Sequence, residues 1–198
     1  MYCGDEIMIL IIDNQSAFLK KFKRQYLSEQ DIECLFLDHN QPIIIPKGKK
    51  VKGIILSGGK GTPYEPLNLT ADFVSLMNFD VPVLGFCLGH EIIAVAYRGR
   101  IKRMPVPQIR KELVTITKLG DVLFDGLPTN QIMMQKKHHH HVVEAPPGFL
   151  VMGYSEHCAV EIMRHPIRLI YSFQGHPEVS GPLGVKIVEN FFKICGVL

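Results

Sequence analysis

The sequence has few cysteines and no long apolar run. Its five cysteines, among 198 residues, are odd in number and widely spaced, which excludes a disulfide framework and a CxxC metal pattern. The longest apolar run, Ile7 to Ile12, stops at Asp13, far short of the roughly 20 residues that span a bilayer. No basic segment precedes this run. We therefore expect neither a signal peptide nor a membrane segment, and we expect a cytoplasmic protein.

The net charge is also small, at +3. A nucleic-acid-binding domain would be expected to carry a stronger basic face with interleaved aromatic residues. The lysines are instead dispersed, and the densest cluster is Lys47, Lys49, Lys50 and Lys52. We therefore predict no nucleic-acid partner and no membrane partner. With 46% hydrophobic and 21% charged residues, the composition excludes disordered, collagen-like and coiled-coil chains.

The first half of the chain alternates short apolar strands with helices. Strands are predicted at 8–13, 33–37, 53–57 and 82–85, and helices after Ser16, at 69–79 and at 89–97. This order predicts a parallel sheet covered on both faces. Shorter segments at 112–117, 131–134, 142–144, 150–155, 159–163 and 169–173 predict extra antiparallel strands in that sheet, and Pro182 opens a final helix.

A cysteine stands between two glycines where a predicted strand meets a predicted helix. The segment Gly85-Phe86-Cys87-Leu88-Gly89-His90 has the small-nucleophile-small layout of a nucleophile elbow, with cysteine in place of serine. At a helix N-terminus the thiolate is favoured, so we expect a lowered pKa for Cys87. The alternative is a buried cysteine in an ordinary strand–turn–helix junction.

A histidine and a carboxylate follow the last predicted strand. In Gly175-His176-Pro177-Glu178, His176 can carry the proton of a nucleophile and Glu178 can hold the imidazole in the required tautomer. Taken alone, His-Pro-Glu is a common turn. Its place after a strand puts it at the edge where α/β proteins form their sites.

A third segment, Ser57-Gly58-Gly59, should reach the same edge. A glycine amide there can donate to a developing oxyanion, and the amide of Leu88 can supply the second donor. The segment is similar to the start of an SGGxDS pyrophosphatase loop, but Lys60-Gly61-Thr62 does not continue that pattern.

Taken together, these segments resemble the triad-type class I glutamine amidotransferases. That family has the elbow Gly-x-Cys-x-Gly-His-Gln, a Ser-Gly-Gly turn and a His-Pro-Glu segment, and the similarity spans nearly the whole chain. The resemblance implies an α/β fold with a flavodoxin-like, mostly parallel sheet flanked by helices, additional antiparallel strands in the second half, and a single domain over 1–198.

Within the family, the later part of the chain is most similar to the stand-alone glutaminase subunits of archaeal-type GMP synthases. The segments that carry this similarity are Ala145 to Phe149, Ser155 to Cys158 and Glu161 to His165. The resemblance implies that this chain hydrolyses L-glutamine. A separate ATP-pyrophosphatase subunit, which binds ATP and magnesium, would then aminate XMP. No cofactor and no metal are expected on this chain itself.

The resemblance also implies roles for individual residues. Cys87 attacks the glutamine side-chain amide, His176 transfers the protons and Glu178 orients His176. The amides of Gly59 and Leu88 hold the oxyanion. The residues expected to bind the substrate are Gly58, Glu91 and His138. Because free ammonium is a poor nucleophile, a channel to the partner is expected, with little activity until that partner docks.

Three positions depart from the family pattern. Glu91 replaces a glutamine that helps to bind the substrate, and an ionised carboxylate cannot donate a hydrogen bond, so weaker glutamine binding is expected. Gly175 replaces an aromatic residue, which predicts looser packing around His176. The run His138 to His141 replaces a Ser-His-containing segment. We interpret it as a loop at the partner interface, with a metal site as the alternative.

Other functions remain open. The chain could serve another synthase, such as one for anthranilate or aminodeoxychorismate. It could be a cysteine hydrolase or deglycase with an elbow, although those enzymes place the histidine differently. It could also be an inactive regulatory module, because similarity of fold alone does not establish activity.

Overall fold

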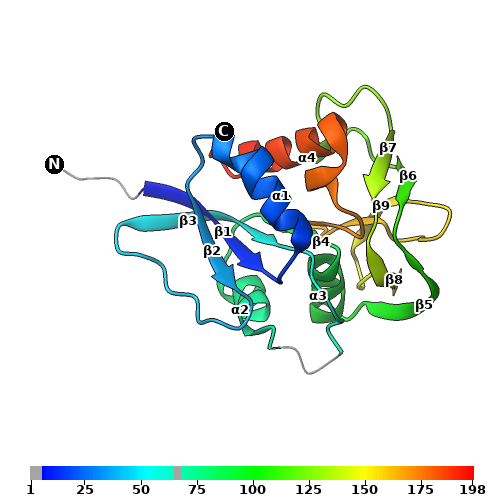
Figure 1. The fold of residues 1–198 in the computed structure, drawn as a ribbon, viewed down its shortest axis with the longest axis horizontal. Helices are drawn as coiled ribbons and strands as arrows, with labels where there is room; N and C mark the ends of the chain where they lie inside the picture. The colour runs from blue at the N-terminus through cyan, green and yellow to red at the C-terminus, as the bar shows by residue number, and fades with distance from the viewer. Residues whose placement is uncertain (1–5, 65–67) are drawn as a thin grey trace.

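A nine-stranded mixed sheet forms the centre of the molecule (Figure 1). The computed structural model describes residues 6–64 and 68–198. The strand order across the sheet is β2-β1-β3-β4-β11-β10-β9-β6-β7, and β5 pairs with β8 in a separate two-stranded sheet. The strands are β1 (Glu6–Asp13), β2 (Cys34–Asp38), β3 (Lys49–Leu56), β4 (Val83–Phe86), β5 (Arg100–Gln108), β6 (Lys111–Ile116), β7 (Gln131–Gln135), β8 (His138–Glu144), β9 (Leu150–Tyr154), β10 (Ile162–Arg164) and β11 (Ile170–Phe173).

The large sheet has a parallel part and an antiparallel part. Neighbouring strands from β2 through β1, β3 and β4 to β11 run parallel. From β11 onward, β10, β9, β6 and β7 pair antiparallel. Sequential βα units produce the first part because parallel neighbours need a crossover connection, whereas short turns suffice for the second. The predicted α/β sheet with additional antiparallel strands is confirmed, except that the strand predicted at 142–144 is part of β8, in the separate two-stranded sheet.

Helices cover both faces of the parallel strands. They are α1 (Ala17–Gln25), α2 (Thr70–Asn78), α3 (Leu88–Ala96) and α4 (Gly181–Ile194), with short 3₁₀ turns η1 (Leu27–Glu29), η2 (Val122–Phe124) and η3 (Pro177–Val179). One apolar core joins α1 and α4 to the sheet through Phe22 and Phe191. The other joins α2 and α3 to it through Leu76 and Ile92. Figure 1 shows these two pairs on opposite sides of the parallel strands.

Two elements differ from the sequence-based expectations. β5 was not predicted, because its sequence is rich in charged residues and contains Pro105 and Pro107. Among the described strands it pairs with β8 alone, and the register shifts between Arg103 and Gln108, where the prolines lie. The prediction of a loop over His138 to His141 is wrong, because these residues form the first half of β8.

Within the described residues, we find no helix that is both long and apolar enough to cross a bilayer.

Candidate active site

Four neighbouring parallel strands deliver their following loops to one edge of the sheet. The loops after β1, β3, β4 and β11 begin at Asn14, Ser57, Cys87 and Gln174. A cavity of about 470 Å³ opens there. Its walls come from these loops, the start of α1, and the segments around β5 and β8. The lining residues are Gln15, Ser16, Ala17, Phe18, Gly59, Lys60, Gly61, Cys87, Leu88, Glu91, Arg103, Lys137, His138, His139, His140 and His176.

Cys87 occupies a strained turn between β4 and α3. Its φ of 50° and ψ of −103° are unusual for a residue with a side chain. The glycines on either side allow the close packing that holds this turn. A methyl group on Gly85 would lie 2.9 Å from the carbonyl of Gly89, and one on Gly89 would collide with the carbonyl oxygen of Leu56. The predicted strand–turn–helix arrangement around Cys87 is confirmed.

The thiol of Cys87 is buried and carries its proton. Cys87 is 3% exposed, and its Sγ lies 3.6 Å from the carbonyl oxygen of Lys137, which can accept the S–H. Burial raises the pKa of the thiol well above its usual value, and Glu91 and Glu178, when ionised, raise it further. The Leu88 amide and Lys136 act in the opposite direction. The lowered pKa expected from the helix N-terminus is therefore wrong for this state, because desolvation outweighs the helix dipole.

His176 is held by its neighbours on three sides. Its Nδ1 lies 2.8 Å from Oε1 of Glu178, and both side chains are buried. Its backbone N–H donates to the carbonyl of Gln135 at 2.9 Å. The ring of Phe18 packs edge-on at a centroid distance of 4.5 Å. With Glu178 accepting at Nδ1, Nε2 is the nitrogen left for proton transfer.

Gly58 lies between the cysteine and the histidine. A methyl group on Gly58 would lie 3.3 Å from Cβ of Cys87, 2.6 Å from Cε1 of His176 and 3.5 Å from its Nε2. The structure therefore brings these two side chains together across the glycine that follows β3. Gly58 is not among the residues that line the cavity.

The two residues expected to donate to an oxyanion both line the cavity. Leu88 begins α3 directly after Cys87, and its backbone amide contacts the thiol. Gly59 is packed closely, because a methyl group there would collide with the carbonyl oxygen of Asn14 and lie 2.8 Å from Cδ2 of Leu88. The two residues are thus adjacent in the fold.

The space beside Gly175 is filled. A side chain there would collide with Cγ of Met134, which is itself 1% exposed. Met134 supplies from β7 the apolar volume that an aromatic residue at 175 would otherwise supply. The expected looser packing around His176 is therefore wrong.

Glu91 lies in the first turn of α3 and lines the cavity. Its side chain is buried, and Oε1 accepts a hydrogen bond from Nε2 of Gln174 at 3.1 Å. Burial raises the pKa of this carboxyl to about 8, only partly opposed by the hydrogen bond. At neutral pH most of the group is therefore protonated and can donate as well as accept, as a glutamine would.

The four histidines lie at the start of β8, and His138 is the buried one. His138 lines the cavity, and its Nδ1 lies 2.7 Å from the carbonyl oxygen of His140. Nδ1 is therefore the protonated nitrogen, and burial lowers the pKa of His138 to about 3. A neutral imidazole presents a lone pair at Nε2.

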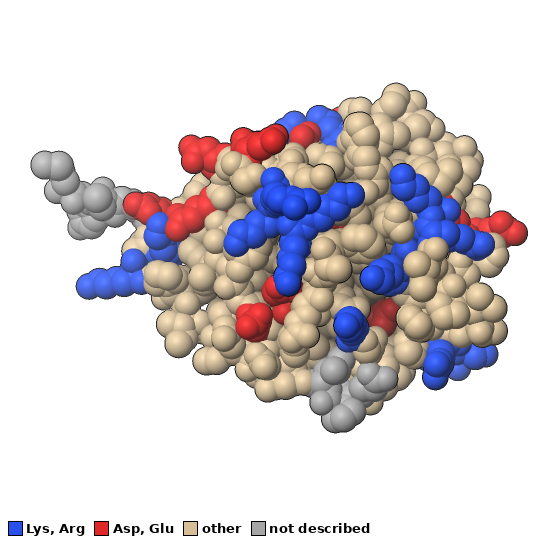
Figure 2. Space-filling view, viewed as in Figure 1, with Lys and Arg blue, Asp and Glu red and all other residues tan. Residues whose placement is uncertain are grey.

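The mouth of the cavity is basic. Lys60, Arg103 and Lys137 line it. Figure 2 shows Lys and Arg side chains over α1 and, separately, over the part of the same face where β5 to β8 lie. An anionic group, such as the α-carboxylate of an amino acid, is favoured at such a mouth.

Several site residues were missed by the sequence-based reasoning. Gln174 directly precedes the Gly-His-Pro-Glu segment, which could have drawn attention to it. Phe18, which packs against His176 from α1, was given no role in the site. Lys136 is fully buried against Glu161, and no local pattern distinguishes it from a solvated lysine.

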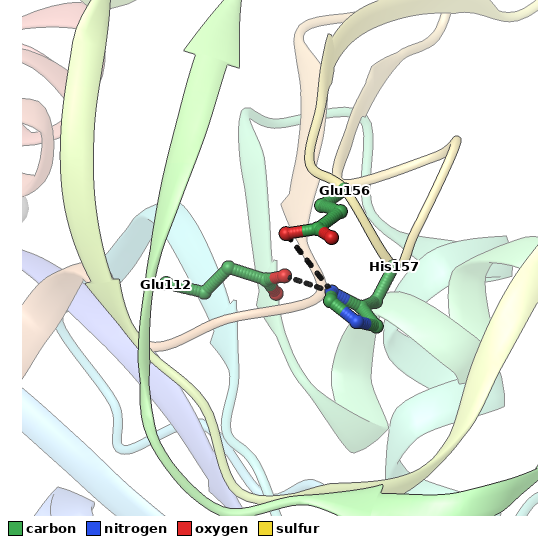
Figure 3. Close-up of side chains that lie close together, drawn as sticks. All are labelled: Glu112, Glu156 and His157. Atoms are coloured by element: carbon green, nitrogen blue, oxygen red, sulfur yellow. Dashed lines mark hydrogen bonds and ion pairs between the residues drawn. The ribbon is translucent and has the colours of Figure 1, made fainter.

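Among the described residues, one group has ligand atoms close enough for a metal ion, namely Glu112, Glu156 and His157 (Figure 3). None of these three residues lines the cavity. Arg110 Nη2 already lies 2.8 Å from Nδ1 of His157 and 3.4 Å from Oε1 of Glu112. An arginine at this distance competes with a cation, so the arrangement favours an ion-pair cluster.

Comparisons with known proteins show the family to which most of the chain is similar. The family model for glutamine amidotransferase class-I matches residues 10–195. A relative from Methanococcus aeolicus, named as a glutamine-hydrolysing subunit of GMP synthase, is 36% identical over 96% of this chain and 99% of its own length. One of the same name from Thermococcus kodakarensis is 34% identical over 96% of this chain and all of its own length.

Solved structures share the fold. One from Thermoplasma acidophilum has a TM-score of 0.79 at 24% identity and covers 96% of this chain and 94% of that one. A glutamine amidotransferase from Thermotoga maritima has a TM-score of 0.71 at 16% identity and covers 96% of this chain and 81% of that one. With a family model that spans nearly its whole length, the chain belongs to the class I glutamine amidotransferase family.

Proposed function

We propose that this chain hydrolyses L-glutamine and passes the ammonia to a separate ATP-dependent GMP synthase subunit that aminates XMP. The observation that carries the proposal is that Cys87, at the elbow, and His176, bound to Glu178, face one cavity. The names of relatives at 34–36% identity over their full length support the choice of partner. ATP and magnesium would be bound by that partner.

The first half of the reaction forms a thioester. His176 takes the proton from Sγ of Cys87 as the sulfur attacks the side-chain amide carbon of glutamine. The amides of Gly59 and Leu88 stabilise the oxyanion, each by about 3 kcal/mol of barrier. His176 then gives its proton to the departing nitrogen, and ammonia leaves. Glu178 keeps the imidazole in the required tautomer throughout.

The second half releases glutamate. Water loses a proton to His176 and attacks the γ-glutamyl thioester, and the proton returns to the sulfur of Cys87 when the bond breaks. Glu91 and His138 would contact the substrate in the cavity, and Gly58 would leave room for His176 beside Cys87.

Activity should be low in the isolated chain. The resting thiol is buried and protonated, so a rearrangement on docking is needed before it reacts readily. We propose that the partner provides this rearrangement and that His139 and His140, which line the cavity, lie near its surface. Residues 1–198 would act as one domain, and a cytoplasmic location stays a prediction.

The test is ammonia release from glutamine by this chain, alone and with a GMP synthase ATP-pyrophosphatase subunit, ATP, magnesium and XMP. We expect stimulation by the partner and formation of GMP. Cys87→Ala should abolish glutamine-dependent synthesis and leave ammonia-dependent synthesis by the partner intact. Glutamine hydrolysis that persists in Cys87→Ala would contradict the mechanism. Stimulation by the synthase component for anthranilate or aminodeoxychorismate instead would contradict the partner.

A further inference from the structure

A buried ion pair lies behind the wall of the cavity. The side chains of Lys136 and Glu161 are 0% and 1% exposed, and Nζ of Lys136 contacts Oε2 of Glu161. Burying two charges costs several kcal/mol per ion, and their attraction seldom exceeds that cost. Such a pair is weak evidence for added stability, so its contacts with the site decide its role.

Lys136 lies in the middle of a segment that contacts the side chain of Cys87 and the backbone of His176. The carbonyl of Gln135 accepts the backbone N–H of His176 at 2.9 Å. The carbonyl of Lys137 lies 3.6 Å from Sγ of Cys87. The segment 135–138 therefore lies against the site, with Lys137 and His138 lining the cavity, and the side chain of Lys136 anchors it in the interior.

Glu161 is tied to the chain that follows β11. Its backbone carbonyl accepts the N–H of Gln174 at 2.8 Å, two residues before His176. Its Oε1 accepts a hydrogen bond from Ser155 Oγ at 2.7 Å, so both carboxylate oxygens are bonded. The ion pair thus joins the segment 135–138 to the strand end that carries His176.

The charge of Lys136 also acts on the thiol. Its ammonium lowers the pKa of Cys87, against the effects of burial and of Glu91 and Glu178. The charged or titratable groups facing the thiol are Glu91 from α3, Glu178 from η3, His176 and Lys136. Those around Lys136 are Glu161, Glu112, Cys158, His90 and His138.

We propose that Lys136 is a positioning residue of the glutaminase site: its ion pair with Glu161 holds the segment 135–138 against Cys87 and His176 in the arrangement in which Cys87 reacts. The proposal rests on the proposed function for the role of Cys87 as nucleophile.

The test measures the thiolate directly. Alkylation of Cys87 by iodoacetamide is followed from pH 6 to 10 by mass spectrometry of the peptide that contains Cys87. The variants are Lys136→Met, the double variant Lys136→Met/Glu161→Met and the control Lys111→Met. Lys111 is an exposed lysine on β6, and its partner in the β6–β7 register is Gln135. Thermal unfolding of each protein is measured in parallel.

We expect Lys136→Met to slow alkylation at pH 7.5 about tenfold and to move the profile about one unit to higher pH. The double variant should regain thermal stability, because apolar side chains replace the pair, yet still react slowly. Lys111→Met should match the unaltered protein.

A double variant with a wild-type alkylation profile would overturn the proposal, because the pair would then serve packing alone. If Lys136→Met does not fold, the alkylation profile of the double variant still tests the proposal. Alkylation needs no glutamine turnover. If Lys136→Met slows alkylation of Cys87 but the unaltered protein never releases ammonia, the proposed function is contradicted. The role of Lys136 is then still supported.

Discussion

Oε1 of Glu91 accepts a hydrogen bond from Nε2 of Gln174 at 3.1 Å, which joins the first turn of α3 to the segment that carries His176. The sequence predicts weaker glutamine binding at this position because an ionised carboxylate cannot donate. Burial changes that expectation, since a carboxyl with a pKa of about 8 is mostly neutral at pH 7. Weaker binding is then expected only at higher pH.

Glutamine hydrolysis should therefore decline above pH 8. Ionisation of Glu91 removes a donor and places a negative charge beside the thiol, which disfavours the thiolate. In Glu91→Gln this decline should be absent, so kcat/KM at pH 9 should exceed that of the unaltered chain about tenfold. Glu156→Gln, at a carboxylate that is 85% exposed, is the matched control. If the activity of Glu91→Gln declines above pH 8 in the same way, the decline comes from the ionisation of another group.

Glu178→Gln should lower kcat for ammonia release by about 10²- to 10⁴-fold. A glutamine amide can donate to Nδ1 of His176, which selects the wrong tautomer, whereas the carboxylate accepts there at 2.8 Å. Ammonia release with the partner present measures the effect, and thermal unfolding shows whether the fold is kept. Activity within about fivefold of the unaltered chain in a folded variant would contradict the orienting role.

Gly58→Ala should lower kcat by about 10²-fold, because the new methyl group would lie 2.6 Å from Cε1 of His176 and must displace the ring. Gly120→Ala is the control, since a methyl group there has nothing within 4 Å. Steady-state kinetics of both variants are the measurement. Unchanged kcat in Gly58→Ala would mean that His176 can move without loss of function.

Asp72→Asn should stabilise the fold at pH 7.5 by about 1–3 kcal/mol. Burial raises the pKa of Asp72 in the folded protein to about 6, from an ordinary value of 3.8. Between these pH values the folded state binds more protons than the unfolded state, so stability falls as pH rises from about 4 to 6. The hydrogen bond from Asn14 Nδ2 to Oδ1 of residue 72 can remain in the variant.

Thermal unfolding from pH 4 to 8 is the measurement for Asp72. The gap between the variant and the unaltered chain should open between about pH 4 and 6 and then stay constant. A gap that is independent of pH would show that the gain comes from packing and not from ionisation.

Local signals in the sequence were enough to predict the loops of the site. Cys87 between glycines, and His176 followed by Pro177 and Glu178, come just after apolar strands. Because carboxyl ends of parallel strands share one edge, their approach could be expected without coordinates. The Ser16 cap of α1 is confirmed in the same way, since its hydroxyl accepts from the amides of Phe18 and Leu19.

The sequence by itself determined the strand–helix alternation and the order of the reactive side chains, because apolar periodicity and glycine turns act over a few neighbouring residues. Only the tertiary structure decided the charge states and the packing around them. Cys87 is buried beside carboxyls, Glu91 takes up a proton, Met134 fills the space beside Gly175, and Lys136 finds Glu161 in a distant segment. Each outcome depends on desolvation and on contacts between segments far apart in the chain, which no local pattern specifies.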